Sequence, residues 1–551
     1  LNIKDKDGSL LTEHDMVVKR WKEYCEDLYM DPQSSLGSEE EGLQITEREP
    51  PPMRSEIVKA VRSLNDGKAP GHDGIPAELY KFGGDTMIDV IHQICLDVWD
   101  TGQWPKDWTQ SVFIPLPKKG DLTDCGNYRT ISLVSHASKI FLSVIMNRIR
   151  NKMESEIPEE QAGFRPFRGT RDQIVNLRII AEKAREFNVP LFLCFIDYTK
   201  AFDSVPHGQL WSVMLEMGFP GHIVQLVGKL YQKQESVVRV GKHETEWFKI
   251  RRGVRQGCII SPYLFNIYSE KVMRVALDGY EKGFRIGGRL INNLRYADDI
   301  VLIATSEADL QELVNRVLVA SERASLTINI AKTKVMVSSK ETQTVTVDIH
   351  GVKLEQVQSF VYLGSTFQES GECSNDIRKR LAMGRSAIQS LNKIWRSRDV
   401  AVSTKVRLVK ALVWSIATYG CEGWTLRKED QRRIEAFEMW CFRRLLRISW
   451  TQRKTNEWVL QELNEERQLL QSIKRRKMGY YGHVIRKGSC LEKDIIQGCV
   501  SGKRSAGRQR RRWIEDITEW SGLKINEAVR VAEDRRRWHV LLTANPLGGR
   551  H

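Results

Sequence analysis

The sequence predicts a mixed α+β protein, and three observations support this prediction. Residues 191–196 form a short, continuous apolar run after Pro190, which is typical of a buried strand. Residues 294–304 contain two apolar halves around a pair of acidic residues, which is the pattern of a β-hairpin. From residue 374 onward, apolar residues recur at helical spacing. Strands in the middle of the chain and helices toward its end favour the α+β class.

The other elements follow from local patterns. Residues 16–28 have apolar positions near the helical period, and an acidic linker follows at 31–52. Residues 67–76 are dense in Gly and Pro, which predicts either a plain loop or a close backbone approach to a phosphate. We expect helices within 206–240, 261–280, 307–325, 405–418 and 431–448, and short strands within 344–366.

The composition is that of a globular protein. Of 551 residues, 41% are hydrophobic and 28% are charged, which argues against wholesale disorder, and 39 Gly and 16 Pro exclude a collagen-like chain. No apolar run is long enough to predict a transmembrane helix. The ten Cys contain no CxxC pair, so we expect reduced thiols in an intracellular protein. The sequence does not begin with Met and is expected to be part of a longer chain.

The charge of the chain favours a polyanionic partner. Lys and Arg number 85 against 70 Asp and Glu, giving a net charge of +15, although plain solubilising charge is an alternative. Two clusters in the C-terminal region predict nucleic-acid contacts: Lys474, Arg475, Arg476 and Lys477, and then Arg510, Arg511 and Arg512. The interleaved Trp513, Trp520 and Trp538 either stack on bases or form a helical core.

Three carboxylates follow or interrupt the predicted strands. Asp197 ends the run 191–196, and Asp298 and Asp299 lie between the halves of the hairpin. Unpaired carboxylates beside apolar strands are costly, and neighbouring ones repel each other, unless divalent cations neutralise them. Mg²⁺ takes carboxylate oxygens together with substrate phosphates, and two such ions suit phosphoryl displacement. The alternative is two unrelated surface turns.

The residues around these acids form blocks in a fixed order. They are Phe195-Ile196-Asp197-Tyr198-Thr199-Lys200-Ala201-Phe202-Asp203, Arg255-Gln256-Gly257-Cys258-Ile259-Ile260-Ser261-Pro262 and Tyr296-Ala297-Asp298-Asp299. Further blocks lie at 116–120, 127–133, 161–165, 329–334 and 362–364. Together they resemble the motifs of reverse transcriptases, and the set is similar to the non-LTR (LINE-type) retrotransposon enzymes in particular. The resemblance covers residues 55–370 and extends more loosely into the C-terminal region.

The resemblance implies a right-hand polymerase. It would have a helical lead-in and acidic linker at 1–54, fingers and a palm with an antiparallel sheet at 55–370, a helical thumb-like region at 371–470, and a basic nucleic-acid-binding region at 471–551. The implied activity is RNA-directed DNA polymerisation from a DNA 3′-hydroxyl, for target-primed retrotransposition. The implied partners are an RNA template, a DNA primer or target, and dNTPs, with no membrane. The implied location is the nucleus, with a cytoplasmic ribonucleoprotein stage.

The resemblance also assigns roles to individual residues. Asp197 and Asp298 would hold two Mg²⁺ ions, for which Mn²⁺ can substitute, with Asp299 assisting. Lys118 and Arg129 would grip the triphosphate, Gln256 and Gly257 would shape the pocket for nucleotide and template, and Phe202 would exclude a ribose 2′-hydroxyl or else belong to the core. Lys332 is a candidate general acid, with Lys334 as competitor and plain surface charge as the alternative, and Asp203 is interpreted as structural.

Some features depart from the family pattern. Phe167 stands where a small residue is expected, and no segment of the sequence matches the N-terminal endonuclease that relatives typically carry. His483, Cys490 and Cys499 fit no zinc-finger spacing, so no structural zinc is expected. Rival interpretations are a reverse transcriptase of another lineage, such as an intron maturase or telomerase, a catalytically silent nucleic-acid-binding protein derived from a retroelement, and a decaying copy of the element.

Overall fold

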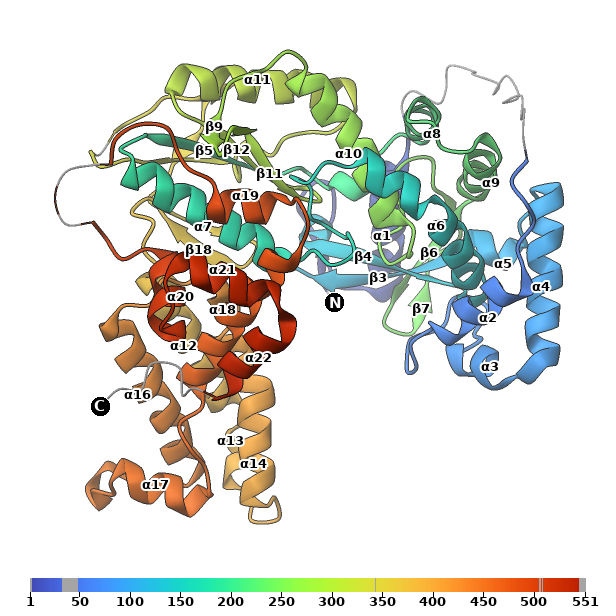
Figure 1. Cartoon of the computed structure of the whole chain (residues 1–551). Helices are drawn as coiled ribbons and strands as arrows, with labels where there is room; N and C mark the ends of the chain where they lie inside the picture. Colours follow the sequence, from blue (N-terminus) through green and yellow to red (C-terminus); the bar gives the residue numbers. More distant parts are fainter. Residues whose placement is uncertain (1, 32–47, 342, 505–506, 508, 545–551) are drawn as a thin grey trace. The chain divides into compact units, whose positions relative to one another are not determined.

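The structure is a computed structural model that describes residues 2–31, 48–341, 343–504, 507 and 509–544 (Figure 1). The chain divides into two compact units whose segments alternate along the sequence. Unit 1 comprises residues 1–158, 197–280 and 315–329, and unit 2 comprises residues 159–196, 281–314 and 330–551. The acidic linker expected at 31–52 lies largely outside the described residues.

Unit 1 contains a five-stranded sheet accompanied by helices. The strands pair in the order β4-β3-β6-β7, and β8 also pairs with β6. Its elements are β1 (Ile3–Lys4), β2 (Leu10–Leu11), α1 (His14–Tyr29), α2 (Arg54–Arg62), α3 (Ala77–Phe82), α4 (Gly84–Thr101), α5 (Lys106–Thr109), β3 (Gln110–Pro117), β4 (Tyr128–Val134), α6 (His136–Glu156), α8 (His207–Glu216), α9 (Gly221–Gln232), β6 (Glu235–Val240), β7 (His243–Glu244), β8 (Phe248–Lys249) and α10 (Ser261–Leu277). Helix α11 (Glu307–Arg323) has residues in both units.

Helix α1 packs on this sheet through one face. Its buried residues Val17, Trp21, Cys25 and Tyr29 recur every four positions, so they form a single stripe. The Trp21 ring meets the Tyr128 ring of β4 edge-on, with centroids 5.2 Å apart. The helical lead-in predicted from the sequence is therefore part of the core of unit 1.

One prediction for unit 1 is wrong. The helical pattern expected over 206–240 holds for α8 and α9, but residues 235–240 form strand β6. This segment is rich in Val and pairs in parallel with β3, with Gln110 opposite Glu235. A partner strand more than a hundred residues away decides its conformation, which local periodicity does not reveal.

Unit 2 is built around a second five-stranded sheet, with the order β11-β12-β5-β13-β16. The strands of unit 2 as a whole, which also include three separate two-stranded sheets, are β5 (Leu191–Ile196), β9 (Phe284–Ile286), β10 (Arg289–Ile291), β11 (Asn293–Tyr296), β12 (Asp299–Ala304), β13 (Lys334–Ser338), β14 (Asp348–Ile349), β15 (Val352–Lys353), β16 (Glu355–Gln356), β17 (Ser359–Tyr362) and β18 (Ser365–Gln368). Strand β5 is central and buried along its whole length, as its continuous apolar sequence predicts.

Helices make up most of the rest of unit 2. They are α7 (Thr170–Glu186), α12 (Ser374–Ser390), α13 (Asn392–Arg396), α14 (Val402–Leu408), α15 (Trp414–Ala417), α16 (Lys428–Leu445), α17 (Asn456–Leu463), α18 (Leu469–Arg486), α19 (Leu491–Gln497), α20 (Trp513–Ser521), α21 (Ile525–Glu533) and α22 (Arg535–Ala544). A π-helical segment, Val409–Val413, joins α14 to α15. Helices and strands thus both contribute, which confirms the α+β class.

The other element predictions are confirmed. The predicted helices correspond to α1, α10, α11, α14 with α15, and α16, while β5, the β11–β12 hairpin and β14 to β17 lie where strands are expected. Residues 67–76 form a loop between α2 and α3.

The tryptophans of the C-terminal region belong to the core. Trp513, Trp520 and Trp538 are each 2% exposed and pack in one cluster with the other helices of unit 2. The Trp513 indole N–H donates to the Glu422 carbonyl at 2.8 Å, and that of Trp538 donates to Met478 at 3.0 Å. Of the two interpretations of these residues, the helical core is correct, because no ring face remains for a base.

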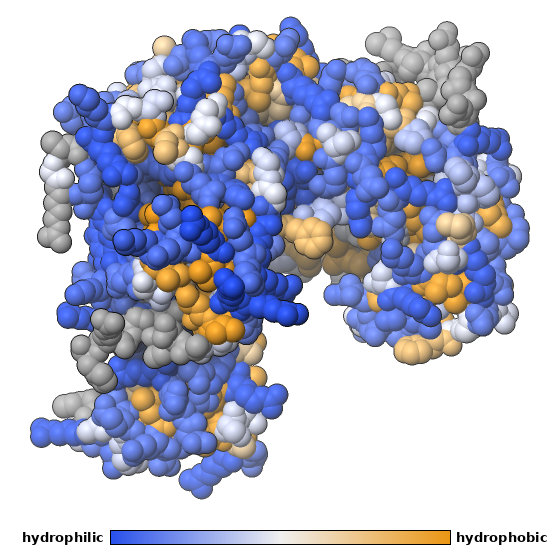
Figure 2. All heavy atoms as spheres, viewed as in Figure 1, coloured by the Kyte–Doolittle hydropathy of each residue, from blue (hydrophilic) through white to orange (hydrophobic). Residues whose placement is uncertain are grey.

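The visible surface is mostly polar. On the face drawn in Figure 2, hydrophilic residues predominate and hydrophobic residues form separate patches among them. Within the described parts of the chain, none of the helices combines the length and apolarity that a membrane crossing requires.

Candidate active site

Asp298 and Asp299 lie at one edge of the unit 2 sheet, and Asp197, the first residue of the second segment of unit 1, directly follows strand β5 of that sheet. In the antiparallel register, Ile196 at the end of β5 pairs with Ile300 near the start of β12. Asp197 follows Ile196 and Asp299 precedes Ile300, so the sheet leads both acids to the same edge. Asp298 precedes Asp299 in the turn. Asp299 is exposed and Asp197 and Asp298 are partly exposed, so dissolved ions can reach them.

The turn that carries Asp298 is tight and strained. Tyr296 pairs with Asp299, which leaves only Ala297 and Asp298 to connect β11 and β12. Ala297 has φ of 58°, in the left-handed region that favours glycine. A residue with a Cβ adopts this conformation only when its surroundings enforce it.

The Gln161 side chain provides that enforcement. Its side-chain oxygen accepts hydrogen bonds from the backbone N–H groups of Ala297 and Gly163, both at 2.9 Å. Gln161 is 1% exposed, so these bonds do not compete with water. A Cβ on Gly163 would lie 2.4 Å from the Ala297 nitrogen, so only glycine permits this approach. The block 161–165 therefore supports the acidic turn.

Backbone and side-chain bonds extend this support. The Ala162 N–H donates to the Arg295 carbonyl at 2.9 Å, and the Arg295 N–H donates to Glu160 at 2.8 Å. The buried amide of Gln173, on α7, donates to both of these acceptor residues. Sequence analysis did not single out Gln161 or Gln173. The signal for Gln161 was its place inside a family block, whereas Gln173 carries no local signal.

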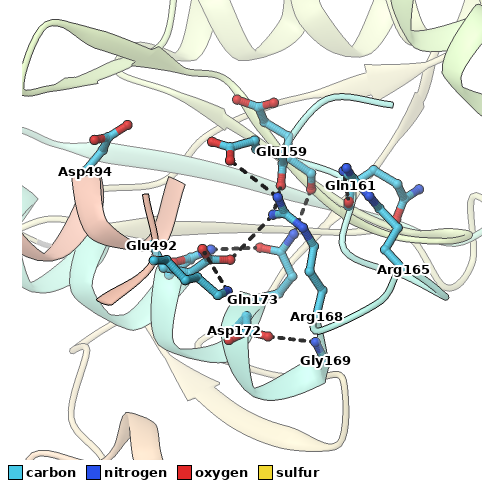
Figure 3. Close-up of polar contacts among 12 residues, drawn as sticks. Glu159, Gln161, Arg165, Arg168, Gly169, Asp172, Gln173, Glu492 and Asp494 are labelled. Carbon is cyan, nitrogen blue, oxygen red and sulfur yellow. Dashed lines mark hydrogen bonds and ion pairs between the residues drawn. The ribbon is translucent and has the colours of Figure 1, made fainter. Parts of the chain in front are cut away.

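A salt-bridge network lies beside this support (Figure 3). Arg168 pairs with Glu159 at 3.4 Å and with the buried Glu492 at 3.6 Å.

Phe167, where a small residue is expected, has φ of 59° and is 87% exposed. Its ring therefore fits at the surface, and the unusual residue leaves the bonds of Gln161 intact.

Strand β13 begins at the same edge of the sheet as the acids. Its first residue, Lys334, pairs with Phe195 of β5. The Lys334 ammonium is held by the Glu355 carboxylate at 2.7 Å and by the Ala331 carbonyl at 2.5 Å. Lys332, two residues earlier, is exposed. Of the two competing lysines, Lys334 is thus committed to an ion pair.

The β17–β18 hairpin packs against Phe195 near the end of β5. Phe360 stacks on Phe195, with ring centroids 4.2 Å apart. Tyr362 is 4% exposed, and burial, together with the negative charge of Asp299, raises the pKa of its hydroxyl. Tyr362, in the block 362–364, therefore lies close enough to the acidic turn for the charge of Asp299 to affect its hydroxyl.

In unit 1, Asp203 holds together three distant segments. It is 5% exposed and accepts hydrogen bonds from the Gln256 amide at 2.9 and 3.0 Å and from the Tyr29 hydroxyl at 3.0 Å. Tyr29 also contacts the Thr130 hydroxyl at 3.0 Å. Burial raises the pKa of Asp203 to about 6, against the opposing effect of these donors. The structural interpretation of Asp203 fits these contacts.

Gln256 and Gly257 are fixed on strand β4. The Gln256 carbonyl accepts from the Ser132 N–H at 2.7 Å. Gly257 has φ of 112°, and a Cβ there would meet the Ser132 carbonyl oxygen at 2.9 Å. Both the backbone conformation and the close approach require glycine, so the loop is held in one position against the sheet.

Arg129 lies on strand β4 of unit 1, and Lys118 directly follows the end of its partner strand β3. Leu116 pairs with Arg129, and the Lys118 N–H donates to the Asn127 carbonyl at 2.7 Å. This register puts the two basic residues on the same face of the β3–β4 ribbon as diagonal neighbours. Arg129 is exposed and Lys118 is partly exposed. Two cations on one exposed face can bind an anion together.

Phe202 lies in unit 1, a few residues after Asp197. Its ring stacks on Phe265 of α10, with centroids 4.4 Å apart and planes inclined by 15°. Phe202 remains partly exposed. The stacking fixes the ring, and the exposed part leaves it available to contact a ligand.

The prediction for the first basic cluster needs correction. Lys477 is fully buried, and its ammonium donates to Asp516 at 2.6 Å and to the Trp424 carbonyl at 2.8 Å. Lys474 is 5% exposed and lies over the Trp520 ring. Neither lysine can reach a polyanion, because both lie on the inner face of α18. Arg475 and Arg476 are exposed on its outer face, although Arg476 pairs with Glu422 at 2.8 Å.

The second basic cluster remains at the surface of unit 2. Arg510 is exposed, and Arg511 and Arg512 are partly exposed. Arg511 pairs with Asp516 at 2.7 Å, and Arg512 pairs with Glu186 and Glu515. The acidic partners hold these side chains in position, and whether they contact nucleic acid stays a prediction.

Comparison with known families identifies the segment that carries these features. The family model described as "Reverse transcriptase (RNA-dependent DNA polymerase)" matches residues 116–367. These residues form a reverse transcriptase domain. The reverse transcriptase domain contains the three acids, Lys118, Arg129, Phe202, Gln256, Gly257 and Lys332. The clusters at 474–477 and 510–512 lie outside it.

Curated relatives come from retrotransposable elements. The "Transposon TX1 uncharacterized 149 kDa protein" of Xenopus laevis is 29% identical over 342 residues, 59% of this chain and 26% of that protein. The "RNA-directed DNA polymerase from mobile element jockey" of Drosophila melanogaster is 24% identical over 413 residues, 72% of this chain and 44% of that protein. The chain thus spans less than half the length of either relative. These matches confirm the similarity to non-LTR elements.

Among solved structures, apo telomerase from Candida tropicalis aligns with 72% of this chain and 69% of that chain, at 11% identity and a TM-score of 0.38.

Proposed function

We propose that this chain is an RNA-directed DNA polymerase that extends a DNA 3′-hydroxyl on an RNA template. The observation that carries the proposal is the register of β5 and β12, which leads Asp197 and Asp299 to one sheet edge within a reverse transcriptase domain. The sheet of unit 2 around β5 would be the palm, the β3–β4 ribbon would belong to the fingers, and the helices after residue 371 would form the thumb.

The acidic edge suits divalent cations. Asp197, Asp298 and Asp299 offer hard carboxylate oxygens, which are the donors that Mg²⁺ prefers and that Mn²⁺ also accepts. Two adjacent carboxylates repel each other, and a bound cation removes that cost. When bound, two such ions supply charge neutralisation and nucleophile activation for nucleotidyl transfer. The donor type therefore suits the metals that the family implies, while the described residues contain no group of three or more His, Cys, Asp or Glu side chains arranged to hold an ion.

The remaining residues would bind and orient the substrates. Lys118 and Arg129 would attract the triphosphate of a dNTP, because ammonium and guanidinium groups both pair with phosphate. The fixed ring of Phe202 would contact the sugar and exclude a 2′-hydroxyl. Gln256, oriented by Asp203, and the Gly257 backbone would line the nucleotide and template pocket. Lys332, which is exposed, would donate a proton to the leaving pyrophosphate, with Lys334 as the competing candidate.

Primer extension tests the proposal. An RNA template with an annealed DNA primer, dNTPs and Mg²⁺ is expected to give extended product. Asp298→Ala is expected to reduce the rate by at least about two orders of magnitude, because a metal ligand is lost. Asp399→Ala, an exposed acid on a loop of unit 2, is the matched control and should leave the rate unchanged. A folded, RNA-binding protein that extends no primer would instead support the silent nucleic-acid-binding protein.

The choice of template and primer tests the biological role. We propose that the enzyme primes at a nicked DNA target in the nucleus, after a cytoplasmic ribonucleoprotein stage, as the non-LTR resemblance implies. Extension from the 3′-end of a nick, with preference for the 3′-end of the element's own RNA, is the expected result. Equal use of unrelated RNAs, or preference for an intron or a telomeric template, would favour a reverse transcriptase of another lineage.

A further inference from the structure

Unit 2 contains a second basic site that the polymerase proposal does not use. A pocket of about 420 Å³ opens between the C-terminal end of α7, the loop before α12 and the segment before α20. Among the described residues, six cationic side chains line it: Arg185, Lys340, Arg427, Arg510, Arg511 and Arg512. Only three acidic side chains do so, namely Glu182, Glu186 and Glu372. The lining residues themselves thus carry more positive than negative charge, and two acids outside the lining, Asp516 and Glu515, pair with Arg511 and Arg512.

The pocket lies far from the acidic edge. Ser338, at the far end of β13, pairs with Leu191 at the start of β5, and its hydroxyl donates to the Glu369 carbonyl at 2.7 Å. Residues 370–374 and Lys340 line the pocket just beyond these contacts. The acidic edge is at the opposite end of β5, and a strand of this length spans roughly 20 Å. The pocket is thus separate from the candidate catalytic residues.

Helix ends add to the positive charge. The residues that precede the first turns of α12, α16 and α20, which are Cys373, Arg427 and Arg512, all line the pocket. The N-terminal end of a helix carries a partial positive charge, so three such ends favour an anion at one place. The opposing C-terminal end of α7 is offset by its own Arg185.

The acidic residues of the lining position the cations. Glu372 pairs with Arg427 at 2.7 Å and with Arg510 at 3.4 Å. The Glu182 carboxylate accepts a hydrogen bond from the backbone N–H of Trp513 at 2.8 Å, and desolvation raises the pKa of Glu182 to about 7. Arg185 donates to the Glu369 carbonyl at 3.1 Å, and its burial, followed by the positive charge of Arg510, lowers the pKa of Arg185. The arginines are held as neighbours despite their mutual repulsion, and an anion between them would relieve it.

We propose that this pocket binds a phosphorylated ligand of about nucleotide size, supplied either as a free nucleotide or as one nucleotide of a bound strand. Guanidinium groups match phosphate oxygens in a forked geometry, and several of them at one place favour phosphate over a single carboxylate. The volume suits one small group. The inference gives Arg510, Arg511 and Arg512 a defined pocket, and it does not depend on the proposed polymerase activity.

Binding in EDTA tests the proposal, because divalent cations are then absent and the acidic edge cannot hold a nucleotide through them. The probes are AMP and a short single-stranded DNA oligonucleotide with or without a 5′-phosphate, measured by calorimetry and fluorescence anisotropy on the full chain. Arg185→Gln combined with Arg510→Gln is expected to weaken binding by about tenfold or more. Arg398→Gln combined with Arg536→Gln removes the same charge from exposed sites elsewhere in unit 2 and should change binding by less than about twofold.

The outcomes separate the sources of the ligand. Loss of AMP binding in the pocket variant identifies a free nucleotide, whereas loss of oligonucleotide binding alone identifies a strand. An equal effect of both variants, no effect of either, or displacement by a glutamate-rich peptide but not by AMP would overturn the proposal. The exposed single variant Lys340→Gln provides a second test, because it leaves the buried contacts of the pocket intact. Primer extension by the pocket variant reports separately on the polymerase.

Discussion

Single buried polar residues decide the local geometry within each of the two units. Gln161 uses one side-chain oxygen to hold two backbone N–H groups, and one of them belongs to the strained Ala297. Asp203 uses both carboxylate oxygens to hold Gln256 and Tyr29. In each case the loss of one side chain leaves buried donors without an acceptor, which costs more than the bond itself contributes.

Substitution of Gln161 tests this argument for the acidic turn. Gln161→Ala is expected to lower the free energy of unfolding by about 1–3 kcal/mol, since the N–H groups of Gly163 and Ala297 lose their acceptor. Primer extension should fall further than stability alone explains, with kcat affected more than KM. Gln161→Glu keeps the accepting oxygen and should preserve much of both. Unchanged kcat in Gln161→Ala would contradict a positioning role.

Asp203 gives the stability of the protein a specific pH dependence. Its pKa is about 6 in the folded protein against an ordinary value of 3.8, so between these values the folded state binds more protons than the unfolded state. The contribution of Asp203 to stability is therefore greatest below about pH 4 and declines as the pH rises to about 6, by at most about 3 kcal/mol.

Asp203→Asn removes this titration. Thermal unfolding measured from pH 4 to 7 is expected to show a Tm of the parent that falls relative to that of Asp203→Asn as the pH rises. Taking the difference between the two proteins cancels the contributions of other carboxyl groups. Parallel pH profiles would show that Asp203 titrates normally.

At the scale of elements, close backbone approaches position the loops. The segment 161–163 lies directly against the β11–β12 turn, and Gly257 lies against β4. These contacts need no side chain at the glycine, and so they leave no trace in hydrophobic periodicity. They connect segments that belong to different motifs of the reverse transcriptase domain.

Gly163→Ala tests the first of these approaches. Its Cβ would lie 2.4 Å from the Ala297 nitrogen, so the turn carrying Asp298 must move. Primer extension is expected to fall by about tenfold or more, since small displacements of catalytic groups are costly. Circular dichroism should show the parental helix content. Gly169→Ala is the control, because the nearest atom to its added Cβ is 3.9 Å away, and it should retain activity. Equal activity of both variants would show that the turn tolerates the shift.

At the scale of the whole molecule, the C-terminal region is part of the core of unit 2 and not an appended basic tail. The helices α18, α20, α21 and α22 contribute to the same hydrophobic cluster as β5 and α7. Charge within this region is divided between buried ion pairs and exposed arginines, so charged residues that are adjacent in sequence have different roles. The sequence-based domain boundary at residue 471 stays a prediction.

Variants of α18 separate these roles. Lys477→Gln leaves the buried Asp516 with a weaker partner and is expected to destabilise the protein by about 3–5 kcal/mol. Arg475→Gln, at an exposed position two residues away, should change stability by less than about 0.5 kcal/mol. Thermal unfolding and RNA binding at two salt concentrations distinguish the two. RNA binding that depends on Lys477 in a fully folded variant would contradict the burial argument.

The features that depend on local patterns can be predicted from the amino-acid sequence alone. The continuous apolar run predicts β5, the paired acids predict the β11–β12 turn, and the order of the blocks predicts the reverse transcriptase domain. These signals are strong for two reasons. A strand buried on both faces must be apolar throughout. Carboxylates beside buried strands are costly unless a partner or a cation neutralises them, so their presence indicates a function.

Contacts between residues far apart in the sequence could not be predicted in this way and are known from the fold. Gln161 contacts Ala297, which lies 136 positions away in the sequence. Lys477 is buried, although it carries the same charge as its exposed neighbours Arg475 and Arg476. Strand β6 exists because β3 pairs with it, and the basic pocket exists because three helix ends meet. Each of these features depends on packing between distant segments. Local propensity does not predict it, because propensity reflects only neighbouring residues and not the segment that will pack there.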